Sequence, residues 1–389
     1  MMTYRTWLGV IAFFLVGLNL RPGLTSVGPL LPEIQGNLAL NSVALSFLTM
    51  LPVLSFGLFG PLAPKIAARF GLPRSVLALT VLLAAGLFVR YGDGPAALFG
   101  GTLTLAAAIG MISVMMPAVV RANWPQHVGL MMGIFTMSLC LGAAAGAGLT
   151  APLSHLVGTR EALAAWGLLA LPALLLWALA LPMLRGASAQ PSPKAAVAIW
   201  RQPKAWQVTA FMASQSSLAF ITFGWLPVML QDRGLPLLVA GPLASLSMIV
   251  QAVTALIVPT LAVRNKSQSI WATGIMVVTA LGFVIVLLAP TSFVLLGVIV
   301  LGLGQGGSFA LALTLIPLRS DSPMKAAAMS GMVQSLGSML ASSGPFLVGL
   351  LRPADGDWRG VVLLLLSLAT AATVFGLFAG RPDAGTKPD

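Results

Sequence analysis

Charged residues are scarce in this sequence, acidic ones most of all. Among its 389 residues, 9 are Asp or Glu and 21 are Lys or Arg, so that 8% are charged. A soluble globular protein carries about 25% charged residues, because its surface faces water. A chain that is 58% hydrophobic and so poor in charge cannot cover such a surface. The composition excludes a soluble globular protein and a disordered one, and it predicts a protein whose solvent is largely lipid.

Cysteine and histidine are almost absent. Cys140 is the single cysteine, so no intrachain disulfide can form. His127 and His155 are the two histidines, and both fall in predicted connections between apolar runs. The metalloprotease, P-loop and nucleophile-elbow motifs are missing as well. We therefore expect no metal site, no cofactor and no catalytic residue, and we do not expect an enzyme.

Basic residues give the chain a formal net charge of +12 at pH 7. They stand singly or in small groups between apolar runs, which is typical of membrane loops and not of a nucleic-acid surface. With the N-terminus inside the cell, most of them are cytoplasmic, and the outer connections hold Arg90, Arg160, Arg233, Arg352 and Arg359. The positive-inside rule then predicts a protein of the bacterial cytoplasmic membrane with both termini in the cytoplasm.

Twelve apolar segments are long enough to span a bilayer, which takes about 20 residues each. They run over residues 6–32, 42–63, 75–91, 96–120, 128–153, 162–184, 205–230, 240–263, 269–289, 292–318, 325–351 and 360–380. The first has no small-residue cleavage site at its end, so we interpret it as a spanning helix and not as a cleaved signal. The pattern predicts an all-α integral membrane protein.

The two halves of the sequence resemble each other. Shifted by 195 residues, Leu31 and Pro32 fall on Leu226 and Pro227; shifted by 198, Arg121 falls on Arg319. We expect two pseudo-symmetric six-helix bundles, residues 1–184 and 205–389, joined by a polar cytoplasmic linker at 185–204. This is the plan of the major facilitator transporters. We expect the protein to act as a monomer.

Arg21 is the one basic residue deep inside an apolar segment. A charge at mid-bilayer costs at least about 2.5–3.5 kcal/mol on insertion scales, so Arg21 must face the protein interior or water. No Asp or Glu lies at a comparable depth, and Glu33 is about 18 Å farther along the helix axis. A guanidinium there favours an anion, and its fork suits a planar or linear one. Alternatively, Arg21 binds backbone carbonyls and only organises the first helix.

Proline and glycine surround Arg21. Pro22 and Pro29 each remove a helical hydrogen bond, which predicts a broken helix at mid-depth. Asn19, Thr25 and Ser26 add neutral hydrogen-bonding groups, and we place Asn19 and Thr25 with Arg21 in the candidate substrate site. An ordinary proline kink is the other interpretation.

The motif around Arg21 carries a specific resemblance. The runs Asn19–Pro22 and Thr25–Pro32 are similar to the signature of the cyanate and 2-nitroimidazole transporter family of the major facilitator superfamily. Phe211–Ser216, Trp225–Pro227 and Gly302–Phe309 agree, and the similarity covers nearly the whole chain. It implies a twelve-helix carrier with alternating access, and Arg21 matches the helix-one arginine of the family.

One departure from the superfamily lies between the second and third helices. Pro64 stands where the superfamily loop has an aspartate. The resemblance therefore does not extend to the cytoplasmic charge contact that is usually drawn for this loop in the superfamily.

Four glutamines occupy similar depths in the second half, and those of the seventh and tenth segments rank highest because these helices line the central cavity in the superfamily. They are Gln215, Gln251, Gln305 and Gln334. Each could contact substrate, or could join helices at about 0.6 kcal/mol per hydrogen bond. Gln215, Gln305 and Gln334 complete the candidate site together with Trp225 and Phe309, which could wall the cavity.

Three functions follow as hypotheses. The leading one is carrier-mediated movement of a small, cyanate-like anion, based on Arg21. The second is a carrier or exporter of a neutral or weakly acidic aromatic such as 2-nitroimidazole, based on Trp225 and Phe309. The third is an anion channel or membrane sensor, because no proton-carrying side chain lies deep in the sequence; the duplicated plan argues against it. We expect no membrane-buried protonatable residue in the coupling.

Overall fold

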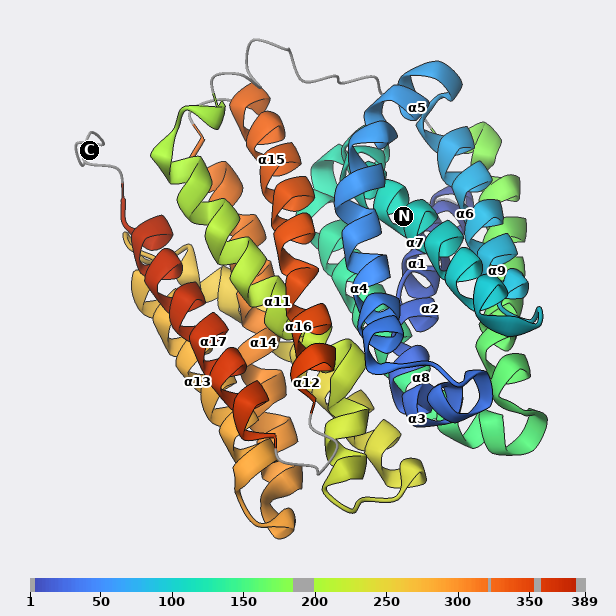
Figure 1. The fold of residues 1–389 in the computed structure, drawn as a ribbon. Coiled ribbons are helices and arrows are strands. Elements are labelled where there is room, and N and C mark those ends of the chain that lie inside the picture. Colours follow the sequence, from blue (N-terminus) through green and yellow to red (C-terminus); the bar gives the residue numbers. More distant parts are fainter. Residues whose placement is uncertain (1–3, 185–198, 321–322, 353–357, 383–389) are drawn as a thin grey trace. The chain divides into compact units, whose positions relative to one another are not determined.

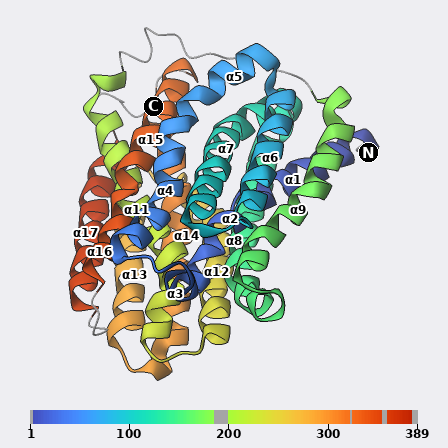
Figure 2. The same ribbon diagram turned by 45° about the vertical axis from the view of Figure 1, so that its right-hand side comes forward.

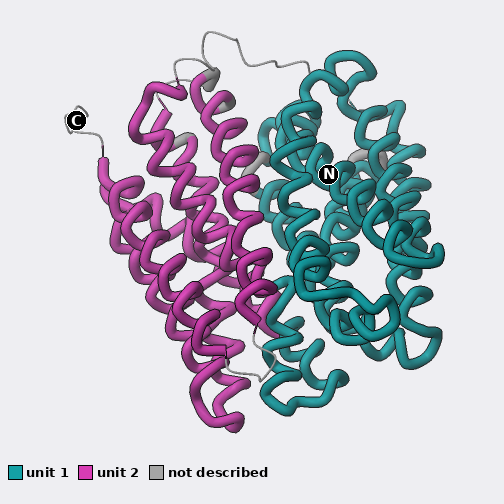
Figure 3. The backbone as a smooth tube through the Cα atoms, viewed as in Figure 1, with its two compact units in different colours: residues 1–190, 223–245 teal, residues 191–222, 246–389 magenta. Residues whose placement is uncertain are grey.

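The computed structural model describes residues 4–184, 199–320, 323–352 and 358–382. Within these ranges every regular element is helical, and no strand occurs. The chain forms two compact units, shown in different colours in Figure 3. Unit 1 comprises residues 1–190 and 223–245, and unit 2 comprises residues 191–222 and 246–389. The all-α fold predicted from the apolar segments is confirmed.

Unit 1 contains the first nine α-helices. They are α1 (Tyr4–Asn19), α2 (Pro22–Thr25), α3 (Val27–Leu38), α4 (Ser42–Phe59), α5 (Ala63–Phe70), α6 (Leu72–Val89), α7 (Gly94–Asn123), α8 (Val128–Val157) and α9 (Thr159–Ala180). Helix α6 packs between α7 and α9, as Figure 2 shows, while α1 and α2 pack against α8.

Unit 2 contains the later helices, labelled in Figure 1. They are α13 (Ser269–Leu288), α14 (Val294–Leu318), α15 (Pro323–Ala341), α16 (Ser343–Leu351) and α17 (Arg359–Gly380). Helix α13 packs against both α14 and α17. Helices α11 (Pro203–Asp232) and α12 (Leu237–Ala262) contribute residues to both units.

Eleven of the described helical stretches are long and apolar enough to cross a membrane. The predicted segment 325–351 is not among them; it forms α15 and α16, with an interruption at Ser342. Pro345 explains the interruption: it has no N–H to donate to the Ala341 carbonyl four residues earlier. That carbonyl accepts a hydrogen bond of 3.1 Å from Ser217 Oγ of α11 instead.

The side chains on the helix surfaces fit a lipid environment. Leu168 of unit 1 is 58% exposed, and Ile270 and Leu363 of unit 2 are 81% and 67% exposed. Inside unit 1, Phe13 is fully buried and packs edge-on against Trp124, with ring centroids 5.5 Å apart. The buried Trp177 donates from Nε1 to the Pro73 carbonyl at 2.8 Å, so its polar atom is satisfied.

Two predictions need comment. The expected linker 185–204 lies mostly outside the described residues, and the domain boundary there stays a prediction. His155 was expected in a connection, but α8 continues to Val157, so His155 lies exposed in the last turn of that helix. The apolar residues Leu156 and Val157 extend the helical run beyond the predicted end.

Candidate functional site: a helix break around Arg21

The first predicted span is broken in its middle. Helix α1 ends at Asn19 and α2 begins at Pro22, within an apolar stretch that runs from Trp7 to Leu38. Pro22 cannot donate to the carbonyl of Leu18, so the α-helical ladder stops there. The Arg21 carbonyl accepts from the backbone N–H groups of both Leu24 (2.9 Å) and Thr25 (3.1 Å), which starts α2. The broken helix predicted from Pro22 is confirmed.

A second interruption follows at Ser26. Helix α3 starts at Val27, two residues before the expected break at Pro29. A proline ring excludes the carbonyl four residues earlier, which here belongs to Thr25, so the ladder fails before the proline itself. Arg21 thus lies directly before a four-residue helix that is interrupted at both ends.

Helix α8 approaches this break through two glycines. A Cβ atom at Gly146 would lie 2.9 Å from the Cα of Pro22, and one at Gly142 would overlap the Leu18 carbonyl oxygen. Glycine at both positions therefore permits the close approach of α8.

Phe223 completes the surroundings of Arg21. The Arg21 Cζ atom lies 5.4 Å from the centroid of the Phe223 ring, a cation–π contact within unit 1. Gly28 positions this ring, because a Cβ at Gly28 would lie 2.9 Å from the carbonyl oxygens of Phe223 and Gly224. Arg21 is half-buried, and its Nη1 atom is shielded from solvent.

Phe223 was not among the predicted site residues. The only signal in the sequence is its position two residues before Trp225, where the stretch Trp225–Pro227 of the family resemblance begins.

The predicted neighbours of Arg21 hold the break together. The buried Asn19 donates from Nδ2 to the Leu15 carbonyl (2.8 Å) and to the Leu169 carbonyl of α9 (3.1 Å). Thr25 donates from Oγ1 to the Arg21 carbonyl at 3.2 Å. Their donors are used within the protein, and their contact with substrate stays a prediction.

The glutamines of unit 2 form hydrogen bonds between neighbouring helices. Gln305 of α14 donates from Nε2 to the Leu218 carbonyl (3.1 Å) and to Thr222 Oγ1 (2.7 Å), both on α11. Its Oε1 accepts from Gln251 Nε2 of α12 at 3.4 Å. Gln215 Oε1 accepts from Ser308 Oγ at 3.1 Å. These bonds support the interpretation as interhelical contacts.

The other predicted site residues lie elsewhere. Gln334 is half-buried and donates to Ser330 Oγ on its own helix at 2.8 Å. Trp225 is fully buried in unit 1, and Phe309 is half-buried on α14 of unit 2. Within unit 1 the structure brings Arg21, Asn19 and Thr25 together, and within unit 2 Ser308 and its hydrogen bonds connect Gln215 and Gln305.

Arg90 is buried. The sequence predicts it in an outer connection, and in the structure it is only 2% exposed. Its Nη1 donates to the Gly23 carbonyl of α2 at 2.7 Å, and its Nε and Nη2 donate to Thr102 Oγ1 at 3.2 and 3.0 Å. Burial lowers the pKa of the Arg90 guanidinium to about 9, which leaves it charged at neutral pH. No sequence signal separated Arg90 from an ordinary loop charge.

Metal ligation finds no support in the described residues. No group of three or more His, Cys, Asp or Glu side chains comes together there. Around Arg21 the described residues offer a positive charge, backbone carbonyls and the ring of Phe223.

Sequence relatives cover nearly the whole chain. An uncharacterized transporter of Bacillus subtilis, YycB, is 37% identical over 96% of this chain and 94% of its own length. A 2-nitroimidazole transporter of Escherichia coli is 33% identical over 96% and 95%, and the cyanate transport protein CynX of the same organism is 29% identical over 92% and 94%.

The fold also matches solved transporters. A D-xylose–proton symporter aligns with a TM-score of 0.73 over 98% of this chain and 99% of its own, at 14% identity. A family profile described as Major Facilitator Superfamily matches residues 9–342. With its long apolar helices, the chain is a multi-pass membrane transporter that belongs to the Major Facilitator Superfamily and resembles its cyanate and 2-nitroimidazole transporters.

Proposed function

We propose that the protein moves a small monovalent anion, cyanate-like in size and shape, across the bacterial cytoplasmic membrane by alternating access. In this proposal both termini face the cytoplasm and the protein acts as a monomer. The observation that carries it is the guanidinium of Arg21 at the helix break in the middle of the first span.

The physical argument starts from the cost of that charge. A cation at mid-bilayer is unfavourable by at least about 2.5–3.5 kcal/mol, and a cation–π contact such as that with Phe223 returns about 2 kcal/mol when desolvated. A bound anion would supply the opposite charge and accept charge-assisted hydrogen bonds from the guanidinium. The sequence between Glu33 and Asp93 contains no acidic residue, so the neighbouring span brings no negative charge of its own.

The relatives support two substrates. The similarity to a cyanate transport protein favours the anion. The similarity to a 2-nitroimidazole transporter and the Phe223 ring beside Arg21 favour a flat aromatic, which is the second candidate. Membership of a superfamily of transporters argues for a carrier and against the channel or sensor.

Uptake into proteoliposomes tests the proposal. Purified protein should take up radiolabelled cyanate with saturation, and cyanate loaded inside should accelerate exchange, as a carrier requires. Arg21→Ala should lower both by at least about tenfold, whereas Arg69→Gln, which removes an exposed arginine of α5, should change neither. Non-saturating flux would indicate a channel, and undiminished uptake by Arg21→Ala would refute the role of Arg21.

A further inference from the structure

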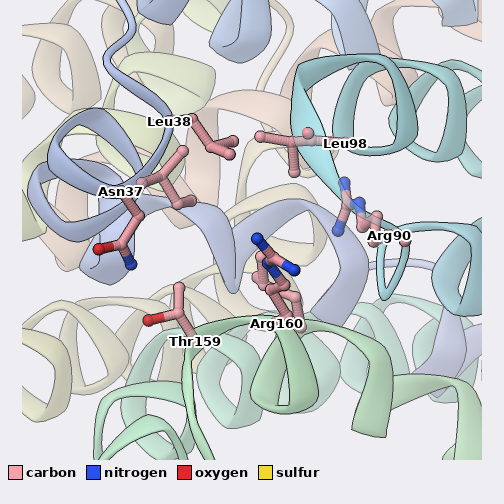
Figure 4. A pocket seen from close by; sticks show the side chains of 10 residues that line it. Asn37, Leu38, Arg90, Leu98, Thr159 and Arg160 are labelled. Carbon is pink, nitrogen blue, oxygen red and sulfur yellow. The ribbon is translucent and has the colours of Figure 1, made fainter.

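A pocket opens at the end of unit 1 where α3 ends, α6 connects to α7 and α9 begins. Figure 4 shows it from close by, with Asn37, Leu38, Leu98 and Thr159 around its wall and Arg90 and Arg160 directed into it. Arg21 is not among the residues that line this pocket, and it lies about 16 residues before the lining residue Asn37 in the same span.

The Arg90 guanidinium has more N–H groups than its hydrogen bonds within the protein use. A guanidinium has five N–H bonds. Three hydrogen bonds to Gly23 and Thr102 use three of them. One N–H on Nη1 and one on Nη2 are left over, and Figure 4 shows the nitrogen atoms of Arg90 turned toward the pocket.

The two charged residues that line the pocket, Arg90 and Arg160, are both basic. Asp93 forms an ion pair with Arg160 at the rim, and Glu33 Oε2 accepts a hydrogen bond from Thr159 Oγ1 at 2.8 Å. No described acidic side chain forms an ion pair with Arg90, although Arg90 is buried and charged. A buried cation with two unused donors, beside a cavity, is a favourable place for an anion.

We propose that this pocket is a second binding site for a small monovalent anion, with Arg90 as the main ligand and Arg160 at its rim. The inference rests on the proposed function, in which the substrate is such an anion. The apolar side chains Leu38 and Leu98 suit an anion that sheds water readily. Because Arg90 also holds the Gly23 carbonyl, two residues from Arg21, an anion in the pocket contacts the group that fixes α2.

Equilibrium binding of radiolabelled cyanate to the purified full-length protein tests both sites. Wild type should bind two anions per chain. Arg90→Gln should remove or weaken one site at least about tenfold and keep the other, while Arg21→Gln should do the reverse. Arg69→Gln is the matched control for charge and should retain both sites.

Each result separates the two proposals. One site that disappears in Arg21→Gln and is unchanged in Arg90→Gln overturns the second site and leaves the proposed function intact. One site that depends on Arg90 alone supports the pocket and overturns Arg21 as the substrate ligand. No binding, or binding that neither substitution changes, overturns both.

Arg90→Gln loses buried hydrogen bonds and could misfold, so a second variant tests the pocket independently. Arg160 is 47% exposed, and Arg160→Gln leaves the bonds of Arg90 in place. It removes a rim charge and releases Asp93, so it should weaken the pocket site and leave the Arg21 site unchanged. Unchanged affinity at both sites would contradict the pocket proposal.

Discussion

The two units bury polar groups of different kinds. Unit 1 holds guanidiniums at Arg21 and Arg90, whereas unit 2 holds the neutral amides of Gln215, Gln251 and Gln305. The amides hydrogen-bond to one another and to neighbouring helices, so they are satisfied without a bound ligand. A guanidinium that stays charged gains from an anion. In our proposal unit 1 supplies the charge recognition, whereas the amides of unit 2 make interhelical contacts.

The glycines sharpen the comparison. In unit 1, Gly142 and Gly146 let α8 contact the broken helix at Arg21. In unit 2, a Cβ at Gly302 would lie 2.6 Å from the Ser247 carbonyl oxygen, so α14 packs equally closely on α12. Both units use close helix approach, and in unit 1 it occurs beside Arg21.

The largest effect is expected from the charge of Arg21. Arg21→Ala should lower the cyanate uptake rate at low concentration by about 10- to 100-fold, the range for loss of a charge-assisted hydrogen bond. Arg21→Lys should fall between wild type and Ala, because an ammonium keeps the charge but lacks the planar fork. Equal uptake by Ala and Lys variants would show that charge is not what the site supplies.

A smaller effect, on stability, is expected from the amides. Gln305→Leu removes the bonds to Thr222 and Gln251, and should lower the free energy of unfolding by about 1–2 kcal/mol, with the KM for cyanate within about twofold of wild type. Thermal unfolding and uptake measure the two quantities. Gln334→Leu is the control, since Gln334 bonds only within its helix at Ser330, and should shift stability less. A large rise in KM for Gln305→Leu would place substrate at the amides.

The smallest effect is expected from Glu33. It lies toward the end of the first span and accepts a hydrogen bond from Thr159, and His127 and His155 are exposed. We therefore predict that Glu33→Gln leaves uptake unchanged, with and without an imposed pH gradient. Accumulation driven by a pH gradient in wild type and lost in Glu33→Gln would assign the coupling to this carboxylate.

The sequence predicted those features that depend on backbone chemistry. Pro22 removes a donor wherever it stands in a helix, so the break beside Arg21 could be foreseen. The same rule at Pro345 predicts a break in the segment 325–351. That segment was nevertheless expected as one helix, because its apolar run is long enough to span the bilayer. Arg90 and Phe223 could not be found, because their roles depend on the Gly23 carbonyl and the Arg21 guanidinium, which are distant in the chain. The amide partners of Gln305 are non-local in the same way.

A thermal-shift panel on wild type and Arg21→Ala tests the central claim most directly. The panel compares cyanate with 2-nitroimidazole at matched concentrations. We predict that cyanate raises the Tm of wild type and not that of Arg21→Ala, because the anion binds the guanidinium. Stabilisation of both proteins by 2-nitroimidazole, with none by cyanate, would contradict the account and favour an aromatic substrate.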